Sequence, residues 1–360
     1  MYDSENKKEL QSFLMKKPKE CKVAVLPDFF LDRLISLNWN PSEFSGLISD
    51  VAKRKGGSID GIPQTDLRGG NAINVASALA NLGAEVTPIV CTSEYGIQQI
   101  KYHFRDIPIN TSHIKIHDKS SVTTALEFKN KNEKTNVMLR DLGALADFGP
   151  ADLNESDYAL IENADYTCLF NWAGTLKFGT ALAQAVFGRA KTKGKGKTYY
   201  DTADPTPNRG AIAELMEKVL KSNQVDILSL NENEAIIYAS LLDKTLNGKK
   251  EHLAFAELAM EAARVLAKHL PARIDLHTTV FSASLKGKTE TAVPTFKVKV
   301  LRATGAGDAW TAGNILGDRN GLSDECRLML ANAVSACYLS DPEGKHPTLT
   351  KLSMFLRDNA

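Results

Sequence analysis

The segment Ala303–Trp310 (ATGAGDAW) combines small residues with a carboxylate at the expected start of a helix. Gly305, Ala306 and Gly307 let backbone N–H groups approach a ligand closely, and Asp308 falls in the first turn of the helix that continues as AWTAGNILG. A helix N-terminus offers unpaired N–H donors and a partial positive charge, so it binds anions. Phosphoryl transfer needs such donors together with a residue that accepts the proton of the attacking hydroxyl. The alternative is a glycine-rich turn in which Asp308 only complements the helix dipole.

A second segment, Arg68–Ala76 (RGGNAINVA), places two glycines before a predicted helix. Gly69 and Gly70 let the backbone touch a ligand, and the amide of Asn74 can donate and accept hydrogen bonds with a sugar hydroxyl. The alternative is a flexible turn with Asn71 as the N-cap of the helix. By itself this pattern favours the turn.

Two further polar positions follow predicted strands. Asn231–Glu234 (NENE) comes directly after the strand Val225–Leu230, where it can hold water around Mg²⁺. The spacing Asn-x-x-Glu is also that of a capping box, which needs no ligand. Asp32 lies six residues past the first strand, and a single aspartate in a loop is usually a turn or cap residue. Neither position indicates a function by itself.

Short apolar runs alternate with helical patterns along most of the chain. The predicted strands are Cys21–Leu26, Glu85–Val90, Tyr166–Phe170, Thr198–Tyr200 and Val225–Leu230, and the predicted helices are Asn71–Leu82, which Gly83 ends, Gly179–Ala190 and Asn233–Leu242. This alternation predicts an α/β fold with a central, mostly parallel sheet and helices on both faces. Ligands bind at the carboxyl ends of the strands in such sheets.

Two segments interrupt the alternation. Residues 29–68 contain a long polar stretch, and residues 113–140 alternate polar and apolar residues around a polar break at Lys129–Lys134. The second pattern is typical of a hairpin. We expect the two segments to form a small β lid that closes over the carboxyl ends of the strands. The chain then consists of one domain over residues 21–360, preceded by an N-terminal extension of residues 1–20.

Composition and charge exclude several classes of protein. The chain has 360 residues, of which 43% are apolar and 24% charged, and its net charge is +1. These values exclude a disordered tail, a fibre and a disulfide-stapled miniprotein. The charge balance gives no reason to expect nucleic acid or an acidic membrane as partner. Five scattered cysteines, the polar N-terminus and the lack of a long apolar stretch predict a cytoplasmic protein with reduced thiols.

In their order along the chain, these motifs resemble those of the ribokinase/PfkB carbohydrate kinase family. That family has an early aspartate, a GG-x-x-x-N segment, a central N-x-x-E and a C-terminal D-T-x-G-A-G-D, and the matching segments extend over about residues 21–340. The resemblance implies a ribokinase-like fold with a small β lid. It also implies ATP- and Mg²⁺-dependent phosphorylation of a hydroxyl on a small sugar or sugar derivative. Members often pair through their lids, so a lid-mediated homodimer is a further expectation.

The resemblance also implies roles for single residues. Asp308 would act as the general base, and the anion hole for the γ-phosphate would consist of Gly305, Ala306 and Gly307. The substrate hydroxyls would be held by Asp32, Gly69, Gly70 and Asn74. The cofactor contacts would come from Asn231, Glu234, Thr304 and Asn332, with Asn231 and Glu234 organising Mg²⁺ through water and Asn332 near the adenine.

The chain departs from the family pattern in three places. Arg302 replaces the first aspartate of D-T-x-G-A-G-D, a position associated with a monovalent-cation loop. Because a guanidinium cannot ligate a cation, we expect activity not to need potassium. The glycine-rich turn near the nucleotide is replaced by Leu276–Leu285, in which His277 either touches a nucleotide or is satisfied in the core. In Asp201–Arg209 an aspartate ends a strand as in the family but its neighbours differ, so Asp201 and Arg209 are candidates only.

Two other functions stay open. The chain could be a nucleoside kinase of the same family, with Phe29, Phe30 and Trp39 either stacking on a base or packing within the lid and core. It could also be a degenerate homologue that binds sugar or nucleotide without turnover, as Arg302 and the missing glycine turn suggest. The intact Gly305–Asp308 motif argues against a pure binding protein, which has no chemical need for it.

Overall fold

A twisted eight-stranded sheet forms the centre of the molecule. The computed structural model describes residues 4–130, 133–249, 252–302 and 304–359. The strand order is β14-β13-β12-β11-β10-β9-β1-β4. The strands are β1 (Lys22–Leu26), β4 (Glu85–Pro88), β9 (Tyr166–Phe170), β10 (Lys197–Asp201), β11 (Ile227–Leu230), β12 (Arg273–His277), β13 (Phe281–Lys286) and β14 (Thr289–Pro294). From β12 to β4 neighbouring strands are parallel, and β13 and β14 extend one edge as an antiparallel hairpin.

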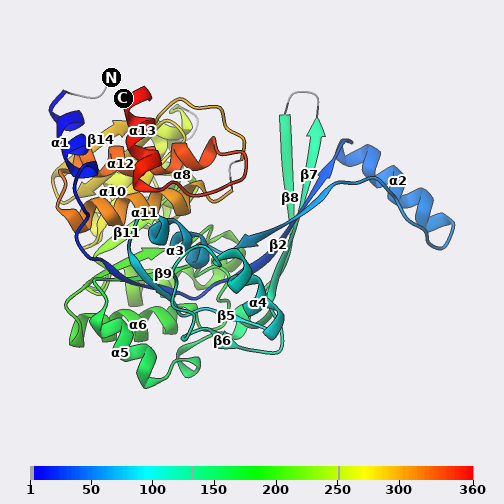
Figure 1. The fold of residues 1–360 in the computed structure, drawn as a ribbon, viewed down its shortest axis with the longest axis horizontal. Helices are drawn as coiled ribbons and strands as arrows, with labels where there is room; N and C mark the ends of the chain where they lie inside the picture. Colours follow the sequence, from blue (N-terminus) through cyan, green and yellow to red (C-terminus); the bar gives the residue numbers. More distant parts are fainter. Residues whose placement is uncertain (1–3, 131–132, 250–251, 303, 360) are drawn as a thin grey trace.

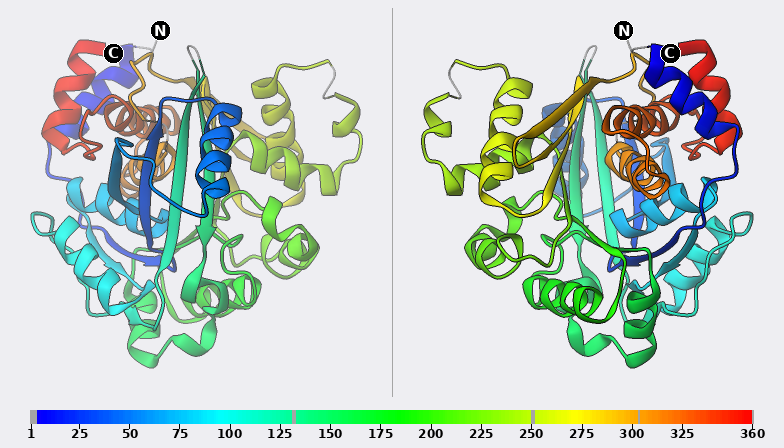
Figure 2. Two further views of the ribbon diagram at one scale, coloured as in Figure 1. Left: turned by 90° about the vertical axis from the view of Figure 1, so that its right-hand side faces the viewer. Right: turned by 90° about the vertical axis from the view of Figure 1, so that its left-hand side faces the viewer.

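Helices cover both faces of this sheet (Figure 2). One face packs against α5 (Glu155–Asn163), α6 (Gly179–Lys193), α7 (Ile212–Leu215), α8 (Glu232–Leu242), α9 (Leu246–Lys249) and α10 (Phe255–His269). The other packs against α1 (Ser4–Leu14), α3 (Asn71–Asn81), α4 (Glu94–His103), α11 (Ala306–Asn320), α12 (Asp324–Leu339) and α13 (Leu349–Asn359). Within β1, Ala24 and Leu26 enter the first core, and Val23 and Val25 enter the second. This alternation between two buried faces is what a parallel sheet requires, and the predicted α/β class is confirmed.

A four-stranded lid projects from the body (Figure 1). Its order is β3-β2-β7-β8, with β2 at Phe30–Leu37, β3 at Gln64–Gly69, β7 at Ser121–Asn130 and β8 at Glu133–Asp141. These strands come from the two segments expected to form a lid, residues 29–68 and 113–140. Part of the polar break, residues 131–132, lies outside the described residues.

The outer end of the lid carries a helix that the sequence analysis did not predict. This helix, α2 (Pro41–Lys53), has Asn40 as N-cap and forms a capping box with Glu43. Asn-x-x-Glu with proline at the first helical position is a helix-start signal, so the signal was present within the stretch treated as merely polar. None of the residues of α2 is buried, so it contributes no core to the body.

The N-terminal segment forms part of the body. Residues 1–20 were expected to be an extension, but α1 packs beside α12 and α13, with Leu10 buried. The carboxylate of Glu9 accepts hydrogen bonds from the backbone N–H of Ser323 at 2.9 Å and from its hydroxyl at 2.7 Å. The first helix, α1, and the last, α13, therefore lie side by side (Figure 1).

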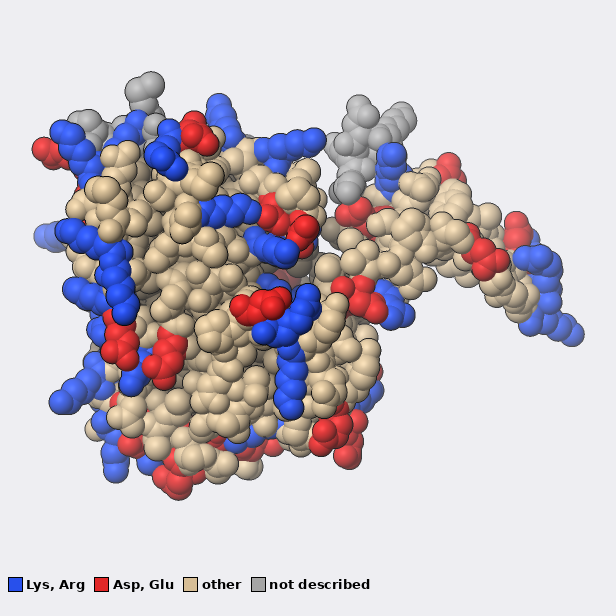
Figure 3. Space-filling view, in the orientation of Figure 1, with Lys and Arg blue, Asp and Glu red and all other residues tan. Residues whose placement is uncertain are grey.

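Shorter elements complete the chain. They are β5 (Cys91–Thr92) and β6 (Lys115–Ile116), which pair with each other, 3-10 turns at Gly143–Asp147, Pro150–Asp152 and Thr206–Ala211, and a π-helical turn at Met216–Leu220. All five cysteines are buried. In the part of the chain that the structure describes, no helix has the length and apolar character needed to cross a membrane. Acidic and basic side chains are interspersed over the face shown in Figure 3.

A buried ionic network fixes α11 and α12 to the sheet. Arg327 of α12 is 1% exposed and donates to Asp275 of β12 at 3.2 Å, to Ser284 of β13 at 2.8 Å and to Asp324 at 2.7 Å. It also donates to the side chain of Asn314 in α11, which in turn donates to Asp275 at 2.8 Å. The positive charges nearby hold the pKa of the buried Asp275 carboxyl far below its ordinary value. The network joins the helix that begins at Ala306 to the strand that ends at His277.

Candidate active site

Polar side chains gather where the parallel strands end. Asp28 follows β1, Asn171 follows β9, Asp201 ends β10, Asn231 follows β11 and His277 ends β12. Carboxyl ends of parallel strands share one edge of a sheet, so these side chains face one region beneath the lid. Three of these positions, Asp201, Asn231 and His277, were candidates from the sequence, whereas Asp28 and Asn171 were not.

Asp308 lies at the start of α11, as the sequence predicted. Gly305 precedes the helix with φ +88°, and a Cβ at Gly305 would lie 2.6 Å from the Tyr338 hydroxyl, so only glycine fits. The first N–H groups of the helix have no intrahelical partner, and the N-cap residue, Gly305, has no side chain to cap them. Asp308 is buried, and its two oxygens accept hydrogen bonds from the side-chain amides of Asn71 and Asn74, each at 2.9 Å.

The surroundings of Asp308 suit it to take up a proton near neutral pH. Burial raises its pKa to about 8. The amides of Asn74 and Asn71 act in the opposite direction because they donate to the ionised form, and the negative charge of Asp201 adds to the rise. A general base is most effective when its pKa lies near the working pH.

The two asparagines in the first turn of α3 hold the Asp308 carboxylate. Asn74 was expected to hold a substrate hydroxyl, and Asn71 was the alternative N-cap; in the structure both amides bind Asp308. The cap of α3 is Asp28, whose carboxylate accepts from the backbone N–H of Asn71 at 2.9 Å and of Ala72 at 2.8 Å. A carboxylate at a helix N-terminus is favourable, but here it comes from a distant loop.

Asn171 binds Asp28, and the backbone of Asn171 itself has a rare conformation. Its amide donates to the Asp28 carboxylate at 2.9 Å, and its backbone N–H donates to the carbonyl of Asp201 at 3.0 Å. Its φ is +51°, in the left-handed region that non-glycine residues rarely adopt. Such strain is held in place by surrounding bonds and is concentrated at functional sites.

Asp32 and the two glycines lie together beside α3. A Cβ at Gly69 would lie 2.0 Å from the Asp32 carboxylate, and a Cβ at Gly70 would lie 2.8 Å from the Asp28 carbonyl, so neither position has room for a side chain. Burial raises the pKa of Asp32 to about 6, and the neighbouring Thr123 hydroxyl acts against that rise. One Asp32 oxygen, Oδ1, is buried and has no hydrogen-bond partner among the described residues. A hydroxyl group of a ligand would satisfy it.

Asn231 and Glu234 form the capping box that was the alternative interpretation of NENE. The Asn231 side chain accepts from the backbone N–H of Glu234 at 3.0 Å, and Glu234 accepts from the backbone N–H of Asn231 at 3.0 Å. Glu234 is buried, and burial together with the charge of Asp201 raises its pKa well above its ordinary value. Burial also raises the pKa of Asp201 to about 6. Arg209, the other candidate in this region, has an exposed side chain.

A cavity of about 640 Å³ opens beside the N-terminus of α11. Ala306 and Gly307 line it together with His277, Trp310 and Asn332. The His277 ring packs on Trp310 with centroids 5.1 Å apart, and its Nε2 is buried without a hydrogen-bond partner among the described residues. Burial lowers the pKa of His277 to about 4, so the ring is neutral. The interpretation of His277 as a satisfied core histidine is therefore wrong.

Asn332 lines this cavity, but its side-chain amide is hydrogen-bonded to other protein groups. Its oxygen accepts from the Trp310 indole at 3.0 Å and from the Ser282 hydroxyl at 2.5 Å, and its nitrogen donates to the Pro294 carbonyl at 3.0 Å. These bonds orient Trp310 and the β13–β14 hairpin. An adenine contact, as expected from the sequence, would have to share donors and acceptors that are already engaged.

Arg302 and Thr304 tie the loop before α11 to the turn after α12. The Arg302 guanidinium donates to the Pro342 carbonyl at 2.9 Å and lies against Gly344, where a Cβ would be 2.0 Å from Nη1. The Tyr338 hydroxyl donates to the Thr304 carbonyl at 2.9 Å, whereas the Thr304 residue itself is exposed. At the position where the family pattern has an aspartate, the positively charged Arg302 side chain thus lies against the Pro342 carbonyl and Gly344.

The aromatic residues considered for base stacking do not form an open platform. Phe29 is 0% and Phe30 is 3% exposed, and the two enter opposite cores. Trp39 packs on Phe44 of α2 with ring centroids 6.2 Å apart. These aromatic side chains therefore pack within the core and lid, which was the alternative interpretation.

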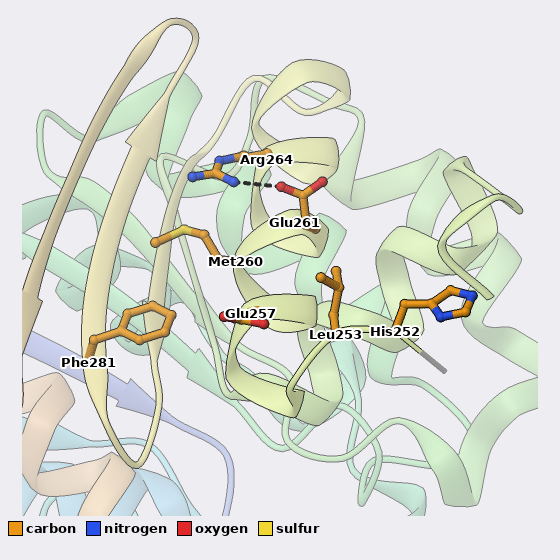
Figure 4. A pocket seen from close by; sticks show the side chains of 7 residues that line it. All are labelled: His252, Leu253, Glu257, Met260, Glu261, Arg264 and Phe281. Carbon is orange, nitrogen blue, oxygen red and sulfur yellow. Dashed lines mark hydrogen bonds and ion pairs between the residues drawn. The ribbon is translucent and has the colours of Figure 1, made fainter. Parts of the chain in front are cut away.

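A separate pocket lies on the outer side of the β13–β14 hairpin, against α10 (Figure 4). Two of its charged residues, Arg264 and Glu261, are paired: Arg264 donates to Glu261 at 2.6 Å and also binds Glu290 through two bonds. Met260, Leu253 and Phe281 make the rest of the wall largely apolar. It shares no lining residue with the cavity beside α11.

Residues 51–351 match the family model described as pfkB family carbohydrate kinase. No curated protein matches the chain significantly. Among solved structures, fructokinase with bound ATP from Xylella fastidiosa is similar at 17% identity and TM-score 0.70, covering 94% of this chain and 98% of that chain. Adenosine kinase from Sinorhizobium meliloti is similar at 18% identity and TM-score 0.69, covering 94% and 99%. Arabidopsis thaliana ribokinase complexed with ribose and ATP is similar at 15% identity and TM-score 0.69, again covering 94% and 99%.

Proposed function

The chain belongs to the pfkB family of carbohydrate kinases, and we propose that it is an ATP- and Mg²⁺-dependent kinase that phosphorylates a hydroxyl of a small sugar or sugar derivative. The observation that carries this proposal is Asp308. It is a buried carboxylate with a raised pKa in the first turn of an uncapped helix, next to a large cavity. A hydroxyl placed against it would meet a proton acceptor and, in the same helical turn, backbone donors for phosphoryl oxygens.

The roles of the surrounding residues follow from their contacts. Asp308 accepts the proton of the attacking hydroxyl, and Asn71 and Asn74 hold its carboxylate in place. The N–H groups of Ala306 and Gly307 stabilise negative charge at the helix start. Asp32, through its unpartnered Oδ1, accepts from another substrate hydroxyl, and Gly69 leaves the room for it.

The residues present fit a nucleotide and a divalent cation. The cavity next to Gly307 would hold the nucleotide, with the unpartnered His277 Nε2 as an available group. ATP would supply the phosphoryl group, and Mg²⁺ would neutralise its charge. Asp201 and Glu234 are buried acids that repel each other, so a nearby cation would favour their ionised forms. No group of three or more metal-ligating side chains occurs within the described ranges, so Asn231 and Glu234 would act on the cation through water.

A panel of acceptors tests this function. Purified protein is incubated with ATP, Mg²⁺ and sugars, sugar phosphates, polyols or nucleosides, and ADP release is followed by a coupled assay. Substrate-dependent ADP release supports the kinase. A panel in which nucleosides outperform every sugar would favour the nucleoside kinase, although the packing of Phe29, Phe30 and Trp39 removes the residue-based argument for it. Calorimetric binding of sugar or nucleotide without any turnover would favour the degenerate binding protein.

A homodimer through the lid belongs to the same proposal. Val122, Val137 and Leu139 are exposed on β7 and β8. Exposed apolar side chains on a projecting sheet are typical of a protein interface. A mass of one chain in analytical ultracentrifugation, independent of protein concentration, would contradict the dimer.

The pH dependence of kcat/KM follows from the raised pKa of Asp308. The base must be ionised, so activity rises with pH through the region near 8 and then levels off. Asn74→Leu removes a donor to the ionised form, which raises the pKa further and moves the midpoint to higher pH. Asn81→Leu, at the other end of the same helix, leaves the midpoint in place. Initial rates from pH 6 to 10 check this, and a flat profile or a shift to lower pH in Asn74→Leu would contradict it.

Potassium is not expected to activate the enzyme. The Arg302 guanidinium already places a positive charge against the Pro342 carbonyl and Gly344, beside the loop that leads to Gly305. Rates are compared in buffers without sodium or potassium and after potassium chloride is added, with choline chloride as the ionic-strength control. A steep rise that potassium alone produces would show that this expectation is wrong.

A further inference from the structure

Arg140 places a positive charge on the same face of the lid sheet as Asp32, which we call the inner face. Asp32 of β2 lies opposite Thr123 of β7, and Thr123 lies opposite Arg140 of β8. Residues directly opposite each other in a sheet point to the same face. With neighbouring strands about 4.8 Å apart, the backbones of Asp32 and Arg140 are about 10 Å apart. The three side chains therefore form one row that starts beside the reaction centre and ends at the edge of the lid.

The position of the Arg140 guanidinium agrees with this register. Its Cζ lies 4.9 Å from the centre of the Phe30 ring, and Phe30 is two residues from Asp32 on the same strand. Burial raises the pKa of both Asp28 and Asp32, and the charge of Arg140 acts against that rise at both carboxyls. Arg140 thus faces the acids of the site and not the outer face of the lid.

Among the described residues, Arg140 has no anionic partner, in contrast to two other cations of the lid region. Arg33 forms a two-bond ion pair with Asp66 at 2.6 and 3.0 Å, and Lys119 pairs with Asp141 at 2.5 Å. Arg140 is exposed, and its guanidinium lies over the Phe30 ring. An arginine held by an aromatic ring, with its hydrogen-bond donors directed to no carboxylate, is suited to bind a carboxylate or phosphate of a ligand in a two-bond fork.

We propose that the acceptor substrate is an anionic sugar, with a carboxylate or phosphate that Arg140 binds while a hydroxyl at the other end of the molecule meets Asp308. The proposal rests on the kinase function and narrows its substrate class. Asp32 then binds a hydroxyl between these two ends, through the oxygen that no protein group satisfies. A neutral sugar of the same length would fill the site but leave Arg140 in water.

The experiment compares neutral sugars, the corresponding sugar acids and the corresponding sugar phosphates as acceptors, for the wild type and Arg140→Met. Methionine keeps an unbranched side chain over Phe30 and removes the charge. The ratio of kcat/KM for the best anionic acceptor to that for its neutral counterpart is expected to fall by about 10- to 100-fold in Arg140→Met. Arg33→Met, which removes a paired lid arginine, should leave this ratio unchanged, and Arg140→Lys should retain part of it.

The sugar-acid and sugar-phosphate arms identify the source of the charge. A ratio that is the same in wild type and Arg140→Met overturns the proposal and leaves the kinase function intact. If no acceptor releases ADP, the kinase function fails, and calorimetry with the same acids and phosphates still decides the role of Arg140. Binding to wild type that is lost in Arg140→Met supports it, and equal binding or no binding overturns it.

Discussion

Asp308→Asn is expected to lower kcat by about 10²–10⁴-fold, the usual contribution of a general base. The substitution keeps the size of the side chain but removes its ability to accept a proton. It also removes a carboxylate whose ionised form is disfavoured by burial, so the folded protein loses no favourable charge. The new amide can accept from one of Asn71 and Asn74, and the other amide can turn to present its oxygen.

ADP release gives kcat for this variant, thermal unfolding reports its fold, and calorimetry reports nucleotide binding. Unchanged unfolding and binding with a loss of kcat is the expected combination. Asp147→Asn provides the control, because Asp147 is an exposed acid that pairs with Lys177 at 2.8 Å on the surface. A kcat for Asp308→Asn within a few-fold of the wild type would remove Asp308 from the role of base.

Arg327→Met is expected to cost about 3–5 kcal/mol of folding free energy, because it leaves the buried Asp275 carboxylate with less compensation. For a chain of this length, this corresponds to a fall of about 4–7 °C in Tm. The variant also loosens the connection between α11 and β12, which carry Asp308 and His277. We therefore expect reduced kcat in the variant at temperatures where it is still folded.

Chemical denaturation of three variants separates the buried network from ordinary surface charge. Arg264→Met removes an arginine that is 49% exposed and paired on the surface, and it should cost about 0–1 kcal/mol. The double variant Arg327→Met with Asp275→Leu also removes the carboxylate that Arg273 binds at 2.9 Å, so it should be less stable than Arg327→Met alone. Equal losses for Arg327→Met and Arg264→Met would show that the buried network does not stabilise the fold.

The local signals of the sequence were sufficient for the fold class and for the position of Asp308. Strand and helix alternation depends on neighbouring residues, and the predicted strand Tyr166–Phe170 coincides with β9. The glycines before α11 and the carboxylate in its first turn are also local features. The helix α2 was missed although its signal, Asn40 to Glu43, is equally local. That error was one of interpretation and not of missing information.

Only the tertiary structure decided how the site is assembled. Asn71 and Asn74 are 237 and 234 positions from Asp308 in the chain, yet both bind its carboxylate. Asp28 caps a helix that begins more than forty positions later. Arg140 joins the row of Asp32 through the register of three lid strands. The spacing of residue types along the chain determines which helices and strands form and which polar groups lie at the end of each. Which ends meet depends on strand order, register and packing, because these contacts join residues that no local pattern connects.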